Sequence, residues 1–168
     1  KISKNDLFEE SKKRIYNLIK QGTGCIEIKS GYGLNYNSEL KMLNVIKDLK
    51  ESLPIEIKST FLGAHAFPKE LSKSEYFDLV INKMLPDFAT KSLVDYVDIF
   101  CEKNYFTAND TEQLIKEAKK YNIPAKIHVN QFNSIGGIKI AVRNKAVSVD
   151  HLEVVNEQDI AELKKGAT

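Results

Sequence analysis

Short runs of β-branched and aromatic residues alternate along the chain with longer segments whose apolar residues recur at helical spacing. Runs of about four to eight such residues are typical of strands, and apolar residues at i, i+3 and i+4 are typical of helices. The strands predicted in this way are Cys25–Ile28, Ile55–Leu62, Tyr96–Phe100, Ala125–Val129 and Ala146–Val149. Each is followed by a predicted helix, and these helices are Ser38–Leu53, Ser74–Leu85, Asn109–Tyr121, Ile135–Asn144 and Asn156–Lys165.

The ends of the chain and the helix starts carry signals of their own. One more helix is predicted at Asp6–Lys20, so the chain is expected to begin inside a helix. It stops at 166–168, where a strand could be starting, and both ends are expected to be cut. Residues whose side chains cap helices precede several predicted helices, and these are Ser72, Asn109 or Asp110, and Asn156.

The regular alternation of strand and helix favours a parallel sheet built from right-handed βαβ units. No linker rich in Gly, Ser or Pro divides the chain, so residues 1–168 are interpreted as a single domain. The one long excursion, 67–93, contains an extra helical pattern between the second and third strands. Such insertions often form part of the rim of a barrel active site, and that is where we expect this segment.

Polar residues placed just after every predicted strand distinguish a barrel from a doubly wound sheet. In a barrel all strand ends point at one axis, whereas in a doubly wound sheet mainly the loops at the switch point reach a ligand. The polar residues in question are Tyr32, His65, Glu102, Asn130 and Gln131, with His128 and His151 at strand tips. The predicted fold class is therefore α/β, a partial (β/α)8 TIM-type barrel with about five of the eight strands that closure needs.

The composition of the chain limits the classes of partner that can be expected. The formal net charge of +2 comes from 25 basic and 23 acidic residues that are interleaved along the chain, so a nucleic-acid partner is not expected. No apolar stretch approaches the roughly 20 residues that cross a bilayer, so no membrane span is expected. Cys25 and Cys101 lie far apart in apolar runs, as small buried hydrophobes do in a reducing compartment, which favours the cytoplasm.

Three histidines, His65, His128 and His151, lie at or just past the C-terminal ends of predicted strands. A lone histidine in that position is usually structural, but three in register at one face favour chemistry. Hydrolytic zinc and iron sites use imidazole and carboxylate ligands and leave one position for a water molecule. His128, which has an apolar neighbour on each side, is the best ligand candidate.

Five motifs then occur in a recognisable order and spacing. They are Lys29-Ser30-Gly31-Tyr32-Gly33-Leu34, Phe61-Leu62-Gly63-Ala64-His65-Ala66, Asp98-Ile99-Phe100-Cys101-Glu102, Lys126-Ile127-His128 and Asp150-His151-Leu152. From Gly22 onward the chain resembles the imidazolonepropionases of histidine degradation, which are metal-dependent amidohydrolases. The first two motifs are specific, whereas Asp-His-Leu alone would be a weak signal.

The resemblance implies a hydrolase that opens the ring of 4-imidazolone-5-propanoate to give N-formimidoyl-L-glutamate, with zinc or iron holding the attacking water. Members of that family take their metal ligands from a His-x-His pair on the first barrel strand, one later histidine, and an aspartate on the last strand. The later histidine matches His128, and the other ligands have no counterpart in residues 1–168. The 168-residue chain alone is therefore expected to be inactive and to retain metal poorly.

The same resemblance assigns roles to other residues. Tyr32 and His65 match residues that contact the substrate, and His151 matches a catalytic histidine near the reacting carbonyl, suited to polarising it or relaying a proton. Gln131 stands where many relatives have glutamate. Glutamine can orient a ring N–H or a water but cannot accept a proton, so Gln131 is expected to bind and orient the substrate.

Alternatives remain open at this point. Cys101 and Glu102 could form a thiol nucleophile with a neighbouring carboxylate, although adjacent residues of a strand point to opposite faces. The chain could also come from another cyclic amide hydrolase or base aminohydrolase of the same superfamily, or be a flavodoxin-like binding module without catalysis. The sequence does not choose between zinc and iron, and it leaves open whether the protein forms a homo-oligomer.

Charged residues interrupt predicted strands at Glu27, Lys58, Asp98 and Lys126. If His128 points to the inside of the barrel, strand alternation places Lys126 there as well. Unpaired charges in that position would be costly. We therefore hypothesise that some of these four residues form an ion-pair network inside the barrel, beneath the site.

Overall fold

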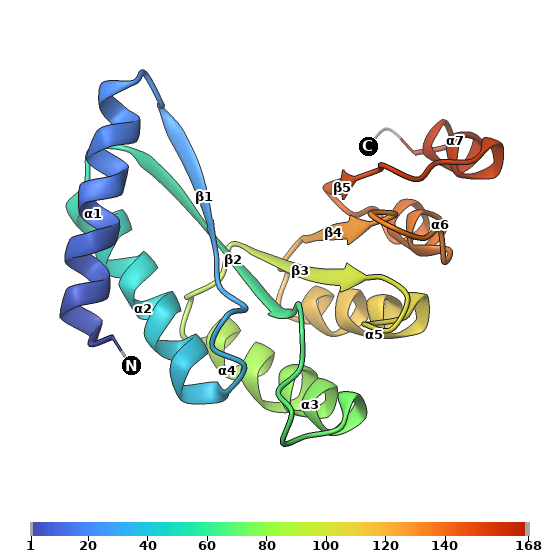
Figure 1. Cartoon of the computed structure of the whole chain (residues 1–168), viewed down its shortest axis with the longest axis horizontal. Coiled ribbons are helices and arrows are strands. Elements are labelled where there is room, and N and C mark those ends of the chain that lie inside the picture. The colour runs from blue at the N-terminus through green and yellow to red at the C-terminus, as the bar shows by residue number, and fades with distance from the viewer. Residues whose placement is uncertain (1, 167–168) are drawn as a thin grey trace.

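Five parallel strands form one curled sheet in the computed structural model of the protein, which describes residues 2–166 (Figure 1). The strands are β1 (Cys25–Lys29), β2 (Glu56–Ala64), β3 (Tyr96–Cys101), β4 (Ala125–Val129) and β5 (Ser148–His151). The helices are α1 (Lys4–Lys20), α2 (Tyr36–Ser52), α3 (Lys73–Leu79), α4 (Leu85–Thr90), α5 (Ala108–Lys119), α6 (Gly137–Arg143) and α7 (Glu157–Leu163), with a π-helical segment η1 (Val80–Met84) between α3 and α4.

The strand order confirms the predicted partial barrel. The strands follow one another in chain order, from β1 at one edge to β5 at the other, and every neighbouring pair is parallel. A flavodoxin-like sheet reverses its order at a switch point, and this sheet does not. The flavodoxin-like alternative is therefore wrong.

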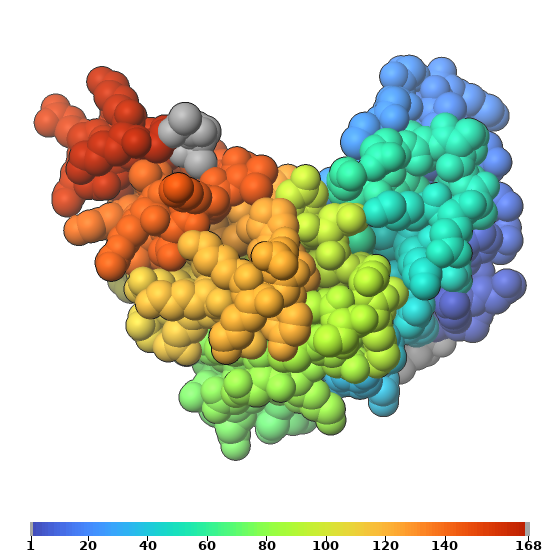
Figure 2. Space-filling view, turned by 180° about the vertical axis from the view of Figure 1, so that it is seen from behind, coloured from blue at the N-terminus to red at the C-terminus, as the bar shows by residue number. Residues whose placement is uncertain are grey.

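In the described part of the chain, the α-helices lie along the outer, convex side of the sheet, and the opposite side is left uncovered (Figure 1). The space-filling view shows the molecule hollowed between its N-terminal arm, in blue and cyan, and its C-terminal arm, in orange and red (Figure 2). The described chain is thus an incomplete barrel whose inner face is open.

The two faces of the sheet have opposite chemistry because successive strand residues point to opposite sides. Residues on the outer face are apolar and fully buried beneath the helices, and they include Ile57, Val97, Ile99, Ile127 and Val129. Burial of each such side chain contributes about 1.5–3 kcal/mol. The inner face carries charged residues instead, which are described below.

Most predicted helices are found at the expected places, and their caps explain where they start. Ser72 and Asn156 cap α3 and α7 as predicted, each in a reciprocal capping box. The prediction of Asn109 or Asp110 as a cap is wrong. Thr107 caps α5, and Asp110 is the third helical residue, whose carboxylate accepts the backbone N–H of Thr107.

The terminal predictions are corrected in part. Helix α1 begins at Lys4, where the Ser3 side chain accepts the backbone N–H of Asp6, so the described chain does not begin inside a helix. Of the strand start expected at 166–168, Gly166 lies in a turn, and residues 167–168 lie outside the described residues. The fifth strand ends at His151, two residues beyond the predicted boundary.

Within the excursion 67–93, residues 73–90 are helical without a break, as α3, η1 and α4, where the sequence predicts a helix at Ser74–Leu85. In η1 the backbone N–H of Leu85 bonds the carbonyl of Val80, five residues earlier. Pro86 follows directly and has no N–H to continue the ordinary helical ladder, so the local change of helix type accommodates it. Within residues 2–166, no helix combines the length and apolar character that a bilayer crossing requires.

Candidate metal and substrate site

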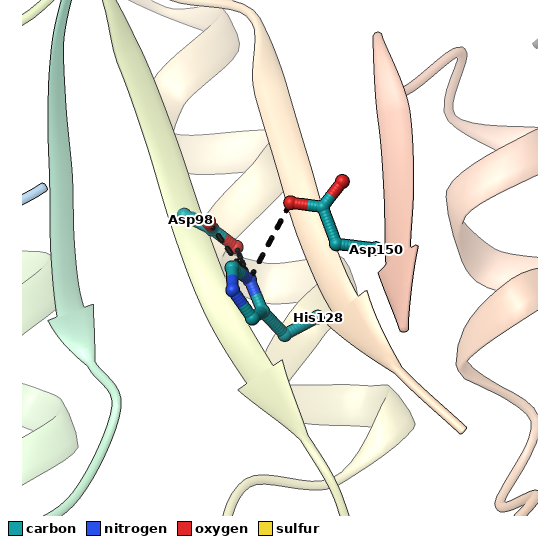
Figure 3. Close-up of side chains that lie close together, drawn as sticks. All are labelled: Asp98, His128 and Asp150. Atoms are coloured by element: carbon teal, nitrogen blue, oxygen red, sulfur yellow. Dashed lines mark hydrogen bonds and ion pairs between the residues drawn. The ribbon is translucent and has the colours of Figure 1, made fainter. Parts of the chain in front are cut away.

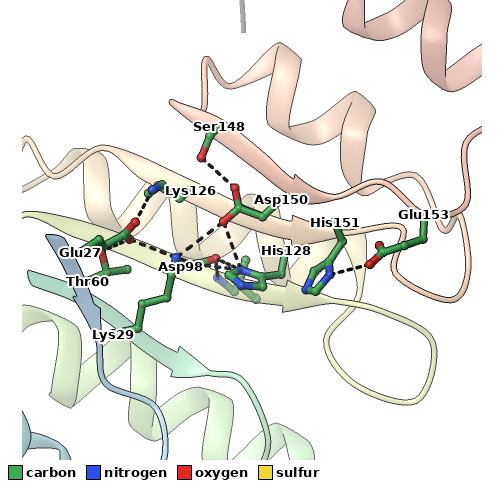
Figure 4. A network of polar contacts seen from close by, with 11 residues as sticks. Glu27, Lys29, Thr60, Asp98, Lys126, His128, Ser148, Asp150, His151 and Glu153 are labelled. Carbon is green, nitrogen blue, oxygen red and sulfur yellow. Dashed lines mark hydrogen bonds and ion pairs between the residues drawn. The ribbon is translucent and has the colours of Figure 1, made fainter. Parts of the chain in front are cut away.

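Six polar residues from four strands meet on the open inner face of the sheet (Figure 4). We call them the inner-face cluster, and they are Glu27, Lys29, Asp98, Lys126, His128 and Asp150. Lys29 is the hub, because its Nζ lies 3.0 Å from Glu27 Oε1, 2.8 Å from Asp98 Oδ2 and 3.7 Å from Asp150 Oδ2. Lys126 Nζ lies 2.5 Å from the other oxygen of Glu27.

The hypothesis of an ion-pair network inside the barrel is confirmed for three of the four proposed residues. Glu27, Asp98 and Lys126 belong to the inner-face cluster. Lys58 does not, because its side chain is 40% exposed and pairs with Glu56 at the start of β2. The cluster holds three carboxylates and two ammonium groups, so it keeps one net negative charge while His128 is neutral.

Asp98 holds the ring of His128 by one nitrogen (Figure 3). The Nδ1 atom lies 3.0 Å from Asp98 Oδ1 and 2.9 Å from Asp98 Oδ2, and the Asp98 side chain is fully buried. A metal-bound histidine commonly donates its second ring N–H to a carboxylate, which fixes the tautomer and the ring orientation. His128 therefore fits a metal ligand that would bind through Nε2.

The carboxylates of Asp98 and Asp150 and the ring of His128 could also form a metal site among themselves, since their ligand atoms lie within 4.8 Å of one another. The ammonium group of Lys29 already contacts both carboxylates from the same face, at 2.8 and 3.7 Å. A divalent ion bound there would meet that positive charge and would displace the Nδ1 contact. The donor geometry therefore favours the Nε2 side of His128.

His151 lies against His128 at the end of β5. The two ring centroids are 5.1 Å apart with an interplanar angle of 62°. His151 and Leu152 both have left-handed backbone, with φ of 81° and 65°, which few non-glycine residues adopt. The Nδ1 atom of His151 lies 3.1 Å from Glu153 Oε1, and within residues 2–166 its Nε2 atom makes no hydrogen bond.

A second pair of rings forms at the ends of β1 and β2. Tyr32 and His65 meet edge to face with centroids 5.3 Å apart. A register shift between Phe61 and Ala64 precedes His65, and the buried hydroxyl of Tyr76 donates to the Gly63 carbonyl within that irregularity. Bulges of this kind redirect the end of a strand, and here the strand runs directly into His65.

The two ring pairs are connected by β3. Phe100 is the register partner of His128, and its ring centroid is 6.2 Å from that of His65. Gln131 is half-buried in the loop after β4, and within residues 2–166 no hydrogen bond joins it to the other candidate residues. A groove of about 300 Å³ beside Tyr32 is lined on its other sides by residues that include Leu7 of α1 and Lys41 of α2.

Comparison with known proteins adds an independent observation. No protein-family model matches the chain. Curated imidazolonepropionases from Christiangramia forsetii, Flavobacterium psychrophilum and Burkholderia ambifaria are 55%, 51% and 43% identical to it over 164, 168 and 164 residues, which is 96%, 99% and 96% of this chain. The chain is a homologue of the imidazolonepropionases. It spans about 40% of the length of these relatives, and the resemblance expected from its five motifs is confirmed.

The thiol alternative does not survive in this imidazolonepropionase homologue. Cys101 is fully buried on the outer face of β3, and burial raises the pKa of its thiol to about 11. A thiol with that pKa is almost entirely protonated near neutral pH, so it is a poor nucleophile. The prediction that both cysteines are buried is wrong for Cys25, which is exposed at the start of β1.

Two members of the inner-face cluster were not predicted. Lys29 and Asp150 were recognised only as parts of the imidazolonepropionase-like motifs, yet they connect β1 to β3 and to β5. A signal for Lys29 was present, because it lies two residues after Glu27 and must share its face. Asp150 shares its face of β5 with Ser148, two residues earlier, whose hydroxyl donates a hydrogen bond to it at 3.3 Å.

The ionisation of Glu27 gives a prediction about acid stability. Burial alone would raise the pKa of its carboxyl, but hydrogen bonds from Lys126, Thr60 and Lys29 lower it from 4.5 to about 2. Because the folded-state pKa is the lower one, the stabilisation is present above about pH 4.5 and is lost as the pH falls toward 2.

We therefore expect the Glu27→Gln variant of the full-length protein to be less stable than wild type at neutral pH. Its free energy of unfolding should also fall less steeply between about pH 5 and pH 2, as measured by denaturant titration at several pH values. Glu9→Gln, which changes an exposed carboxylate of α1, is the control and should keep the wild-type slope. Superimposable pH profiles for Glu27→Gln and wild type would contradict the assignment.

Proposed function

We propose that the full-length protein carrying this chain is a metal-dependent imidazolonepropionase of the amidohydrolase superfamily, and that residues 1–168 form part of its single catalytic domain. It would hydrolyse 4-imidazolone-5-propanoate to N-formimidoyl-L-glutamate in histidine degradation. The reaction breaks the amide C–N bond of the ring, with the hydroxyl of water going to the carbonyl carbon and a proton to the released nitrogen. The observation that supports this most strongly is 41–55% identity to imidazolonepropionases over at least 96% of the chain.

The inner-face cluster supports the metal part of the proposal. His128 would be one ligand, through Nε2, while Asp98 holds Nδ1 and Lys29 balances the charge of Asp98. When bound, a zinc or iron ion supplies the Lewis acidity that makes hydroxide available near neutral pH. The remaining ligands would come from parts of the protein outside this chain.

The other candidate residues would divide the work on the substrate. His151, whose ring contacts that of His128, would polarise the reacting carbonyl or relay a proton through Nε2. Tyr32 and His65 would bind the substrate as a pair from the neighbouring strand ends. Gln131 would orient the ring N–H or the water from the loop after β4.

The small-molecule substrate is the only partner that this proposal requires. Neither nucleic acid nor a membrane enters it, and the cytoplasm is the compartment proposed. Homo-oligomer formation is compatible with the proposal.

A substrate panel tests the proposal. Purified full-length protein loaded with zinc or with ferrous iron is assayed on 4-imidazolone-5-propanoate, a dihydropyrimidine and cytosine. We expect turnover of the imidazolone with a kcat/KM at least about a hundredfold above the other two. Preference for the dihydropyrimidine would instead support a different cyclic amide hydrolase, and preference for cytosine would support a base aminohydrolase.

The role of Gln131 gives a separate prediction. We expect Gln131→Ala to lower kcat/KM by about 10–100-fold, mainly through KM, because the side chain orients the substrate without exchanging a proton with it. Gln131→Glu should not exceed wild-type activity by more than about tenfold, since proton transfer is assigned to His151. Steady-state kinetics on 4-imidazolone-5-propanoate measure both. An increase of orders of magnitude in Gln131→Glu would show that this position needs a carboxylate.

A further inference from the structure

Glu102 at the end of β3 is a buried carboxylate that contacts the loop after β4. Its side chain accepts the backbone N–H of Phe132 at 2.9 Å, the backbone N–H of Asn133 at 3.1 Å and the side-chain amide of Asn133 at 2.9 Å. It also accepts the N–H of Lys103 at 2.7 Å. The residue is 2% exposed, and within residues 2–166 no ion pair balances its charge.

N–H groups, three of the backbone and one of the Asn133 side chain, therefore stabilise the charge of Glu102 in place of a cation. Burial alone would raise the pKa of this carboxyl, but the hydrogen bonds from the two loops lower it overall. None of these hydrogen bonds joins Glu102 to a residue proposed to contact the substrate. It holds residues 132 and 133, which directly follow Gln131.

Glu39 of α2 makes the same kind of contact with the loop after β1. It is fully buried and accepts the backbone N–H groups of Gly31 at 2.7 Å, Gly33 at 2.7 Å and Leu34 at 3.2 Å. The loop leaves no room for side chains at its glycines. A Cβ on Gly31, where φ is 107°, would lie 2.1 Å from the Leu62 carbonyl oxygen. Tyr32 stands between the two anchored glycines.

We propose that Glu39 and Glu102 are positioning residues, and that they fix the loops carrying Tyr32 and Gln131 in the conformation that binds the substrate. The proposal rests on the function proposed above. A carboxylate offers only acceptors, and all seven donors around the two residues are N–H groups. Glutamine at either position would turn an NH2 group toward an N–H donor and leave buried donors without partners.

Amide hydrogen exchange measured on the full-length protein tests the local part. In Glu102→Gln, peptides covering 130–136 should lose protection by about tenfold or more, while those covering 30–36 keep wild-type exchange. In Glu39→Gln, peptides covering 30–36 should lose protection and those covering 130–136 should keep wild-type exchange. Each variant is therefore a control for the other. Loss of protection spread over the whole protein, or none at either loop, overturns the proposal.

A double-mutant cycle tests the positioning part. Glu102→Gln should lower kcat/KM by about 10–100-fold in the wild-type background and by less than about twofold in the Gln131→Ala background. In the Tyr32→Phe background, Glu102→Gln should lower kcat/KM by the same factor as in the wild-type background. Glu39→Gln should show the opposite pattern, coupled to Tyr32 and independent of Gln131. Full multiplicativity in every cycle overturns the proposal, because a merely structural role predicts it.

Asn133→Ala serves where Glu102→Gln fails to fold, since it removes only one of the four hydrogen bonds of Glu102. It should couple to Gln131→Ala in the same sense, and absence of that coupling overturns the proposal. Wild-type protein that fails to hydrolyse 4-imidazolone-5-propanoate contradicts the proposed function instead. The exchange measurement still decides in that case whether the two carboxylates hold their loops.

Discussion

Full-length protein carrying His128→Ala is expected to lose its bound metal and to hydrolyse 4-imidazolone-5-propanoate at least about a thousandfold more slowly. Loss of a partner outside the ligand shell typically costs roughly 10–100-fold in metal affinity or activity, and loss of a ligand should cost more. The proposed assignment gives the reason, because Asp98 contacts Nδ1 and Nε2 is the atom proposed to bind the metal. Metal content by elemental analysis and kcat/KM measure the two effects.

Asp98→Asn is the matched control for this variant. It keeps the side-chain volume and the imidazole but weakens the bond at Nδ1, so metal affinity should fall by roughly 10–100-fold while binding stays detectable. Stoichiometric, tightly bound metal in His128→Ala would contradict the assignment of His128 as a ligand. Equal losses in both variants would indicate that the whole inner-face cluster collapses when either residue changes.

The second large effect is expected at His151. His151→Ala should lower kcat by about 10²–10⁴-fold, the usual contribution of a positioned general acid or base, while the metal content stays at the wild-type value. Glu153→Gln should change kcat by less than about threefold, because the Glu153 side chain is 54% exposed and an exposed partner orients weakly. Steady-state kinetics and elemental analysis are run on the same preparations.

The variants His128→Ala and His151→Ala together decide which histidine binds the metal and which acts on the substrate. The ring centroids lie 5.1 Å apart, so proximity alone does not distinguish a metal ligand from a residue that acts on the substrate. Metal loss in His151→Ala would make His151 a ligand and would remove its catalytic assignment. Unchanged kcat with unchanged metal content would leave it a structural residue at the strained end of β5.

Features that depend on local periodicity can be predicted from the sequence. The five strands were found because the core is built from apolar residues such as Ile99 and Ile127, whose spacing is visible in the chain. Parity within a strand also placed Lys126 on the face of His128, since alternation is a local property. Asp98 was expected there only because its charge interrupts a predicted strand. The location of all three histidines at strand ends followed from the same pattern.

Features that depend on the curl of the sheet could not be predicted. Lys29 reaches Asp98 across β2, over a sequence separation of 69 residues, and that contact exists because the sheet bends around the inner face. The roles of Glu39 and Glu102 likewise depend on backbone N–H groups converging on one point. By contrast, the cap at Thr107 had a local signal, because Thr107 and Asp110 have capping-box spacing. The prediction nevertheless missed Thr107.

A crystal structure of the metal-loaded full-length protein, with anomalous data at the zinc and iron absorption edges, tests the central claim most directly. The expected result is one anomalous peak about 2.0–2.1 Å from His128 Nε2, with Asp98 still at Nδ1 and Lys29 still paired with Asp98. A peak enclosed by Asp98, His128 Nδ1 and Asp150, with Lys29 displaced, would contradict the claim. So would a metal bound elsewhere, with no contact to His128.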